Sequence, residues 1–566
     1  MPGAEKSDII ALALPDGRGS EAAAPRPSPL ALTGILLAGF ALRLPLLDRF
    51  PFHQDEAIYG YWARYARHVD PLFLRVWPDK PPLYLWLLGG TFDLLGATPT
   101  AARLLNIALS TLTIAVVAAL AQTWWGARAG ILAALFLALN PFAISFAPTA
   151  FTDPLLVLAG MTALLAIVRR RPFWAGIWLG VAIMTKQQGV LFVPLVAAFS
   201  LYAPRTPGDL LHRTAALLAG LLLIVAPILA WDSLRWAVAP SPWDLGARNA
   251  AGFALAAPAL WPVRAQGWLE LGSYLLGETW LWLAALGLLL AFGLAWRKWR
   301  SRVHWQPAAG LALWGVTLLA LHIVTTVQVW DRYLLPLAPI VALLLAFTVE
   351  TVLTAGAVSK PHISANLERV VWKPHLLAML LVLALAWPAF AAAQGRLPIG
   401  GDHGAYSGLD EVAAWLTART DAAPVVYQRN LGWHFQFYFF DALQAGRADL
   451  RWYPSAVALA DNAAKTPHRP RYLVVADWSP VRDLPVQLAT RRLAAAERLR
   501  AGHFTVYEIT ETALPPAAWR VCERGARGEG RGAALAEADG TGTFAGFAKL
   551  AAPAAQLSTC PVEDQP

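Results

Sequence analysis

The sequence predicts a polytopic α-helical membrane protein, with about eleven and up to thirteen transmembrane helices, that continues into a small α/β domain. Hydrophobic residues make up 57% of its 566 residues and charged residues only 15%, whereas about a quarter of an ordinary soluble protein is charged. The net charge of +9 does not indicate nucleic-acid binding, because the positive residues lie mostly in short loops between apolar runs, as in membrane proteins.

The predicted spans are charge-poor apolar runs that approach the ~20 residues a spanning helix needs. They lie at residues 29–46, 103–123, 129–147, 153–169, 172–186, 188–204, 214–232, 278–296, 306–328, 333–355 and 375–394. The runs at 172–186 and 188–204 are short, which is consistent with tilted, broken or partly re-entrant helices. Residues 82–97 are apolar but short and interrupted, so we predict an interfacial segment there.

The charge of the loops predicts the orientation in the membrane. Residues 1–28 are rich in alanine, proline and charge and are expected to form a disordered cytoplasmic tail. We find no cleavable signal peptide, so the first span is expected to start insertion itself. Every predicted inner loop then carries Lys or Arg, as the positive-inside rule requires. These residues are Arg128, Arg169, Arg170, Arg171, Arg205, Arg213, the stretch 297–302, Lys360, Arg369 and Lys373.

The composition changes after the last span. We predict a transmembrane domain over 29–396, with a first outer loop at 48–82, and an extracytoplasmic α/β domain over 397–566. In the latter, SGLDEVAAWLTART predicts an amphipathic helix, and APVVYQ, RYLVVAD and HFTVYEIT predict short strands. Cys522 and Cys560 both lie in this part. A disulfide and two free thiols are equally compatible with export, because the sequence does not determine their separation.

The first outer loop carries the most informative pattern. It sets Asp55-Glu56 ahead of Lys80-Pro81-Pro82. An acidic pair and a lysine beside a membrane supply a base for an acceptor hydroxyl and a cation for a departing phosphate. The remaining candidates, Asp153, Lys186 and Arg332, are predicted on the same membrane face. No nucleotide-binding fingerprint is present, which argues against direct use of a nucleotide-activated donor.

Five short motifs in this order resemble those of the GT-C glycosyltransferases of family 39, which include protein O-mannosyltransferases and the aminoarabinose transferases of lipid A. The motifs are Asp55-Glu56, Lys80-Pro81-Pro82-Leu83-Tyr84, Phe151-Thr152-Asp153-Pro154, Met184-Thr185-Lys186 and Arg332-Tyr333-Leu334-Leu335-Pro336. The resemblance covers about residues 30–350. It implies a GT-C architecture, a polyprenyl-phosphate sugar donor and a single inverting displacement.

The resemblance makes Asp55 the general base, and aromatic neighbours in its loop would raise its basicity by partial dehydration. Glu56 points about 100° away on a helix, so we assign it a supporting role that orients the loop. Lys80 and Arg332 are predicted to bind the donor phosphate, because Pro81 and Pro82 hold the lysine extended and a guanidinium can hold two phosphate oxygens. Their alternative role is anchoring at the membrane interface.

Three further residues have open roles. Lys186 and Arg43 are additional candidates for the donor phosphate. Asp153 is either a helix cap or a carboxylate that binds the acceptor or a divalent metal ion, and the resemblance favours a site role. No other cofactor is predicted. In the aminoarabinose branch an arginine follows the acidic pair closely, whereas Ile58 lies there in this chain, which argues against lipid A specificity.

These observations predict an inverting glycosyltransferase of the plasma or inner membrane, with its active site on the non-cytoplasmic face. Its predicted partners are the polyprenyl-phosphate sugar, an acceptor protein, lipid or glycan, and the bilayer, without nucleic acid. Two alternatives remain. One is a lipid-linked glycan binding protein without catalysis. The other is a secondary transporter, for which paired repeats and ionisable residues at the bilayer midplane are expected.

Overall fold

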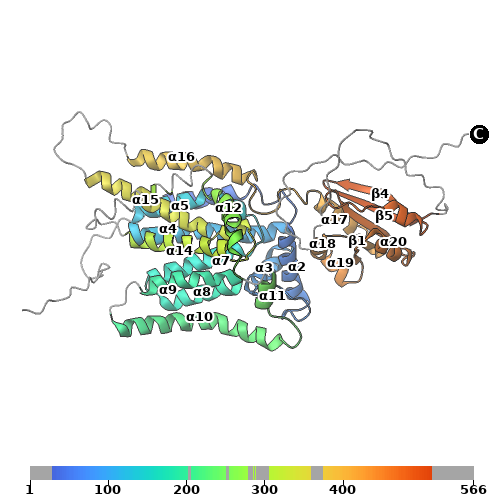
Figure 1. The fold of residues 1–566 in the computed structure, drawn as a ribbon, viewed down its shortest axis with the longest axis horizontal. Helices are drawn as coiled ribbons and strands as arrows, with labels where there is room; N and C mark the ends of the chain where they lie inside the picture. The colour runs from blue at the N-terminus through green and yellow to red at the C-terminus, as the bar shows by residue number, and fades with distance from the viewer. Residues whose placement is uncertain are drawn as a thin grey trace, which may run out of the picture.

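The computed structural model describes residues 28–201, 206–249, 254–277, 285, 287–288, 305–358 and 374–512. A bundle of long helices forms one end of the molecule and a mixed α/β unit forms the other (Figure 1). Several predictions lie outside the described residues: the tail before residue 28, most of the span at 278–296, the basic stretch 297–302, and Cys522 with Cys560.

The bundle is built from apolar helices, and these overlap every predicted span apart from 278–296. These helices are α1 (Pro29–Arg43), α4 (Pro99–Trp125), α5 (Ala127–Ala138), α6 (Pro141–Phe146), α7 (Asp153–Val168), α8 (Pro172–Thr185), α9 (Phe192–Leu201), α10 (Pro207–Arg235), α14 (Gln306–Val324), α15 (Leu337–Val358) and α16 (Pro374–Ala393). Within the described residues, α4, α10, α14 and α15 contain stretches both long and apolar enough to cross a membrane. The total number of spans stays a prediction.

Shorter elements connect the spans on the side of the α/β unit. They are α2 (Gln54–His68), α3 (Leu83–Leu95), η1 (Gln187–Leu191), α11 (Pro242–Asn249), η3 (Pro258–Leu260), α12 (Trp261–Ser273) and η4 (Asp331–Leu334). The predicted interfacial segment 82–97 forms α3, which packs against α2.

The predicted span 129–147 is wrong as a single helix. The structure has two helices there, α5 and α6, because Pro141 begins α6 at a position where its missing N–H is tolerated. Asn140 caps α6 by accepting a hydrogen bond of 3.0 Å from the Ala143 amide, and it donates to the Leu275 carbonyl at 2.9 Å. The break therefore ties the bundle to the loop that follows α12.

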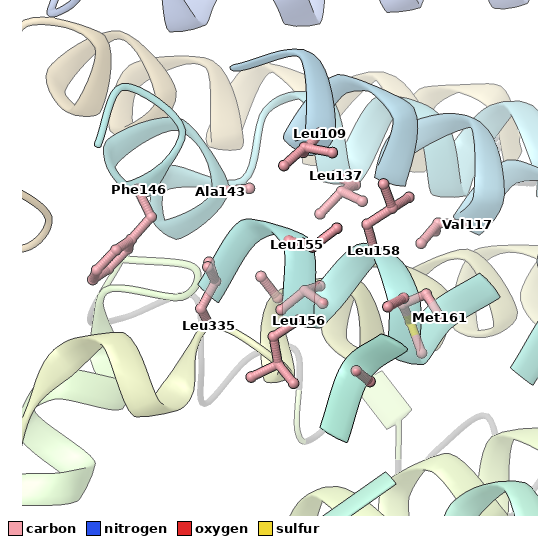
Figure 2. Packing of buried hydrophobic residues seen from close by; sticks show 14 of the residues in the cluster. Leu109, Val117, Leu137, Ala143, Phe146, Leu155, Leu156, Leu158, Met161 and Leu335 are labelled. Carbon is pink, nitrogen blue, oxygen red and sulfur yellow. The ribbon is translucent and has the colours of Figure 1, made fainter. Parts of the chain in front are cut away.

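The centre of the bundle is a layer of buried apolar side chains from α4, α5 and α7. Figure 2 shows members of this layer: Leu109, Val117, Leu137, Leu155, Leu158 and Met161. Leu335, also shown in Figure 2, is buried in the same cluster and directly follows η4. The core thus anchors the short turn that carries Arg332.

Glycines bring α8 and α10 into close contact. A Cβ at Gly176 would lie 1.9 Å from the Leu217 carbonyl oxygen, and one at Gly220 would lie 2.0 Å from the Phe173 carbonyl oxygen. Only glycine fits at such contacts. Small residues are typical of helix packing in membranes, where close backbone approach rather than water exclusion drives association.

The α/β unit contains a five-stranded sheet of order β2-β1-β3-β5-β4. The strands are β1 (Val425–Gln428), β2 (Asp449–Trp452), β3 (Arg471–Ala476), β4 (Leu493–Ala501) and β5 (Phe504–Glu511). Strand β1 pairs in parallel with β2 and β3, and β5 pairs antiparallel with β3 and β4. The predicted strands are confirmed as β1, β3 and β5, whereas β2 and β4 were not predicted.

Helices cover both faces of this sheet. They are α17 (Leu409–Thr417), α18 (Gly432–Tyr438), α19 (Phe440–Gln444), α20 (Ala456–Ala464) and α21 (Leu484–Ala489), with the short turn η5 (Thr420–Ala422) before β1. The predicted amphipathic helix is confirmed as α17. Side chains of α17, α18 and α19 form one apolar cluster with the sheet, and those of α20 and α21 form another.

The α/β unit rests on the first outer loop, where α18 lies beside α2 (Figure 1). Arg64 of α2 donates to the Phe437 carbonyl at 2.9 Å and forms an ion pair with Asp441 at 3.0 Å. His434 Nε2 lies 2.9 Å from the carbonyl oxygen of Phe52. The loop that carries Asp55 is therefore held by the bundle and by the α/β unit.

Candidate active site

The site begins at the N-terminus of α2. His53 caps this helix: its Nδ1 accepts from the Asp55 amide at 3.1 Å, and its own amide donates to Glu56 Oε2 at 2.8 Å. This reciprocal arrangement is a capping box, which determines where the helix starts. It also separates the acidic pair, because Glu56 is turned back into the protein while Asp55 stays partly exposed.

Asp55 forms an ion pair with Arg332 of η4. The two side chains are 19% and 8% exposed, respectively. Burial opposes ionisation of Asp55, but attraction to Arg332 and His53 outweighs it and lowers the pKa of Asp55 to about 2. The carboxylate is therefore ionised and tightly held.

Arg332 has a buried hydrogen-bond donor without an acceptor among the described residues. Its guanidinium lies 4.1 Å from the centre of the Trp330 ring and 5.4 Å from that of Phe151. Its Nε is buried and has no hydrogen-bond partner among the described residues. A buried donor without a partner is unfavourable, so this nitrogen is available to an anion that enters the site.

Lys186 and Asp153 form a second ion pair, with 2.6 Å between Nζ and Oδ1. Both are almost completely buried. Asp153 is the first residue of α7, and Lys186 directly follows α8. Burial lowers the pKa of Lys186 to about 8, although Asp153 opposes this shift. The Lys186 amine also lies 4.6 Å from the centre of the Tyr333 ring.

Lys80 forms the third pair, at 2.7 Å, with its neighbour Asp79. Asp79 also accepts from Asn249 at 2.9 Å, and its backbone carbonyl accepts from Gln187 at 2.8 Å. Asp79 was not predicted as a site residue. These contacts hold Lys80 beside η1 and α11 rather than in open solvent.

We call these three pairs the ion-pair cluster: Asp55–Arg332, Asp153–Lys186 and Asp79–Lys80. The pairs act on one another electrostatically. Beyond the effect of burial, Lys80 contributes to the low pKa of Asp55, and both Arg332 and Lys80 help to lower the pKa of Lys186. The structure thus brings five sequence-predicted residues together. Their formal charges, with that of Asp79, cancel.

Glu56 lies behind this cluster in a fully buried clamp. Its oxygens accept from Arg103 Nε at 3.0 Å and Nη2 at 2.9 Å, and Oε1 also accepts from the Ala150 amide at 2.8 Å. Arg103 belongs to α4 and was not predicted, although an arginine inside an apolar run is an indication of function or buried pairing. The clamp joins α2, α4 and the segment before α7.

Arg43 is not part of the ion-pair cluster. Its guanidinium donates to Ser110 Oγ at 3.0 Å and to the carbonyls of Gly39, Ala138 and Leu137 at 2.7, 3.2 and 3.3 Å. Within the described ranges it has no carboxylate partner. Because backbone carbonyls already occupy its donors, its position does not support the predicted role in binding the donor phosphate.

The described residues around Asp153 bring no cluster of metal-ligating side chains together. In the part of the chain that the structure describes, no group of three or more His, Cys, Asp or Glu side chains comes together to hold a metal ion. The Asp153 carboxylate is instead neutralised by Lys186. We therefore derive no step that uses a metal.

Comparisons with known proteins agree with this fold. Residues 79–231, less than half of the chain, match the family model described as dolichyl-phosphate-mannose-protein mannosyltransferase. No curated protein matches the chain in sequence.

The fold is similar to that of solved membrane glycosyltransferases. ArnT from Cupriavidus metallidurans, bound to undecaprenyl phosphate, has 18% identity and a TM-score of 0.56, over 85% of this chain and 97% of that one. The oligosaccharyltransferase AglB from Archaeoglobus fulgidus, in complex with an inhibitory peptide and a dolichol-phosphate, has 13% identity and a TM-score of 0.50, over 84% and 74%. The arabinofuranosyltransferase AftD from Mycobacteria has 15% identity and a TM-score of 0.52, over 86% and 40%.

The resemblance to GT-C glycosyltransferases that the sequence motifs indicated is therefore confirmed. The low identities restrict the structural likeness to the fold. The role of each site residue stays a proposal.

Proposed function

We propose that this protein is an integral membrane glycosyltransferase that transfers one sugar from a polyprenyl-phosphate donor to an acceptor hydroxyl on the non-cytoplasmic face. The ion-pair cluster carries this proposal, because it places an ionised carboxylate beside three cations at the ends of apolar helices. The family-model match and the fold shared with proteins bound to undecaprenyl phosphate and dolichol-phosphate support a lipid-linked donor.

In the proposed reaction, Asp55 accepts the proton of the acceptor hydroxyl. The hydroxyl oxygen bonds to the anomeric carbon from the side opposite the phosphate, while the bond between that carbon and the phosphate oxygen breaks. The sugar configuration inverts, and the lipid phosphate leaves with one more negative charge. Arg332, Lys80 and Lys186 would stabilise this developing charge more strongly than the charge of the bound donor, which is how such groups accelerate a reaction.

Donor binding would also activate the base. A carboxylate with a pKa of about 2 is a weak base. An incoming phosphate competes with Asp55 for Arg332, whose Nε has no partner within the described residues. Once Arg332 turns toward the phosphate, burial of Asp55 raises its pKa, since the main opposing charge is removed. Asp55 would then become basic only when a donor is present.

The other residues have supporting roles in this proposal. Asp153 positions Lys186 through their 2.6 Å contact until the phosphate arrives. Glu56 touches no reacting atom and is a positioning residue: with Arg103 it holds the start of α2, and therefore Asp55, in place. In this proposal Asp55 is the base and Glu56 positions it, so the two carboxylates of the first outer loop have different roles.

The test is sugar transfer by purified protein in proteoliposomes, using a radiolabelled polyprenyl-phosphate sugar. Asp55→Asn should lower turnover by at least ~10²-fold, the usual contribution of a general base, while donor binding persists. Asp410→Asn is the matched control, because Asp410 is an exposed residue of α17. Donor binding without transfer by the wild-type protein would favour a binding protein, and near wild-type turnover of Asp55→Asn would exclude Asp55 as the base.

A further inference from the structure

A cavity lies in the α/β unit, and no residue of the ion-pair cluster lines it. Its volume is about 350 Å³, within the roughly 300–1,000 Å³ typical of small-molecule sites. The lining residues come from segments that follow β1, β2 and β3: Arg429, Tyr453, Ser455, Ala456, Val457, Pro480, Val481, Arg482, Asp483 and Gln487. A cavity of this volume can hold a molecule the size of a monosaccharide.

The topology of the sheet explains why a cavity forms here. From β1, which lies between β2 and β3, the chain passes through α18 and α19 to β2 on one side, and then through α20 to β3 on the other. These connections cover opposite faces of the sheet. The loops after β1 and β3 therefore diverge, which leaves a crevice at the carboxyl ends of the parallel strands. Open α/β sheets generally bind ligands at such a switch point.

Two arginines of the cavity have no ion-pair partner among the described residues. Among the residues that the structure describes, Arg429 and Arg482 take part in no ion pair. Other arginines of the same unit are paired: Arg451 and Arg469 with Asp449, and Arg491 with Asp461. Unlike these, the two cavity arginines remain available to an external anion, and a guanidinium binds phosphate or carboxylate in a fork.

Further polar groups surround the arginines. The Arg429 charge acts on the Tyr453 hydroxyl, whose pKa burial raises to about 12. Ser455 caps α20 through the Ala458 amide at 3.2 Å, so the positive end of that helix also faces the cavity lining. Asp483 and Gln487 add acceptors suited to sugar hydroxyls. One net positive charge remains among the lining side chains.

We propose that this cavity binds a small anionic saccharide, of monosaccharide size, whose phosphate or carboxylate is neutralised by Arg429 and Arg482. Tyr453, Asp483 and Gln487 would bind its hydroxyls, and Val457 and Val481 would contact its apolar faces. The site is independent of the sugar transfer proposed above, because it uses none of the same residues.

The test is isothermal titration of the full-length protein with three probes of similar size: glucose-6-phosphate, glucuronic acid and glucose. At least one anionic probe should bind roughly tenfold or more tightly than glucose, as expected for a charge-assisted contact. Comparison of the two anionic probes identifies phosphate or carboxylate as the preferred group. Equal binding of glucose, or no binding of either anionic probe, would overturn the proposal.

Variants test whether the anionic probe binds in this cavity. Arg429→Gln and Arg482→Gln should each weaken binding roughly tenfold, and Val457→Trp should block it by filling the cavity without changing charge. Arg498→Gln, which removes the same charge from β4 outside the cavity, should bind normally. Lys80→Ala should also bind normally. Loss of binding in Lys80→Ala together with unchanged binding in Arg429→Gln would assign the anion to the ion-pair cluster and contradict the proposal.

Discussion

Each cation of the ion-pair cluster is neutralised by a carboxylate before a donor arrives. A buried charge without a partner is strongly unfavourable, so these pairs allow three cations to sit close together in a poorly solvated place. Under the proposed function, a donor phosphate would compete with Asp55, Asp79 or Asp153 for its cation. Binding then exchanges one anion for another, and the carboxylate that is released becomes available for chemistry.

The pairing of Arg332 with Asp55 predicts that a change at Arg332 shifts the pH dependence of kcat/KM. In Arg332→Gln the charge that holds the pKa of Asp55 near 2 is absent, so burial should raise this pKa and Asp55 should be protonated at mildly acidic pH. The acid limb of kcat/KM should therefore move to higher pH than in the wild type. Arg332→Lys keeps the charge and serves as the control. An acid limb unchanged in Arg332→Gln would show that Arg332 does not control this carboxylate.

The lowered pKa of Lys186 predicts how kcat/KM falls at alkaline pH. Its pKa is lowered to about 8, mainly by burial, so it loses its proton at a pH where an ordinary lysine stays charged. If Lys186 helps to neutralise the donor phosphate, kcat/KM should fall above about pH 8. Lys186→Arg should extend activity to higher pH, because a guanidinium stays protonated. Lys80→Arg, the same exchange at another residue of the ion-pair cluster, should leave the alkaline fall of kcat/KM at the same pH. If Lys186→Arg also leaves this fall unchanged, another group is responsible for it.

The residues of the candidate site were predictable from the sequence to different degrees. Asp55, Lys80 and Arg332 stand at the ends of apolar runs, where an ionisable side chain is conspicuous. The pairing of each cation was not predictable, because Asp55 and Arg332 are far apart in the chain and meet only when η4 packs beside α2. Arg103 was missed because its pairing with Glu56 joins α4 to the start of α2, a contact that forms only in the folded protein.

The buried ion pair of Glu56 and Arg103 is a contact between two helices, and it holds α2 against α4. Glu56→Gln would leave Arg103 buried without a negative charge, which should destabilise the protein by roughly 3–5 kcal/mol. Thermal unfolding in detergent measures this loss. The double variant Glu56→Gln with Arg103→Met should recover part of it, because no buried charge remains. Equal stability of Glu56→Gln and the wild type would mean that the clamp does not hold α2.

The strands show where local sequence stops determining structure. Strands β1, β3 and β5 were predicted from short runs rich in β-branched and aromatic residues, and the structure buries apolar side chains of each run in the sheet. Strand β4 has the sequence LAAAERLRA, whose residues favour helix in isolation. It is extended because it pairs with β5 along its length, and strand propensity depends strongly on such context. A single sequence carries no signal for that pairing.

For the whole molecule, the loop charges and the structure together predict one orientation in the membrane. The α/β unit packs against α2 (Figure 1), and α2 carries Asp55 of the ion-pair cluster. The cluster and the α/β unit are therefore expected on the same face of the membrane. The basic residues Arg169, Arg170 and Arg171 lie at the opposite ends of α7 and α8 from Asp153 and Lys186. The positive-inside rule then predicts that the cluster and the α/β unit are extracytoplasmic.

Cysteine labelling tests this orientation. In a background with Cys522→Ser and Cys560→Ser, we expect Glu411→Cys, on the exposed side of α17, to react with an impermeant thiol reagent in intact cells. Gly208 is exposed at the start of α10, where an added Cβ would make only an ordinary contact of 3.8 Å with Thr206 Oγ1. Gly208→Cys should react only after the membrane is permeabilised. The two sites lie at opposite ends of the molecule, so they should never label together in intact cells. Labelling of Gly208→Cys alone would place the ion-pair cluster on the cytoplasmic face, and a lipid-linked donor would then have to be used there.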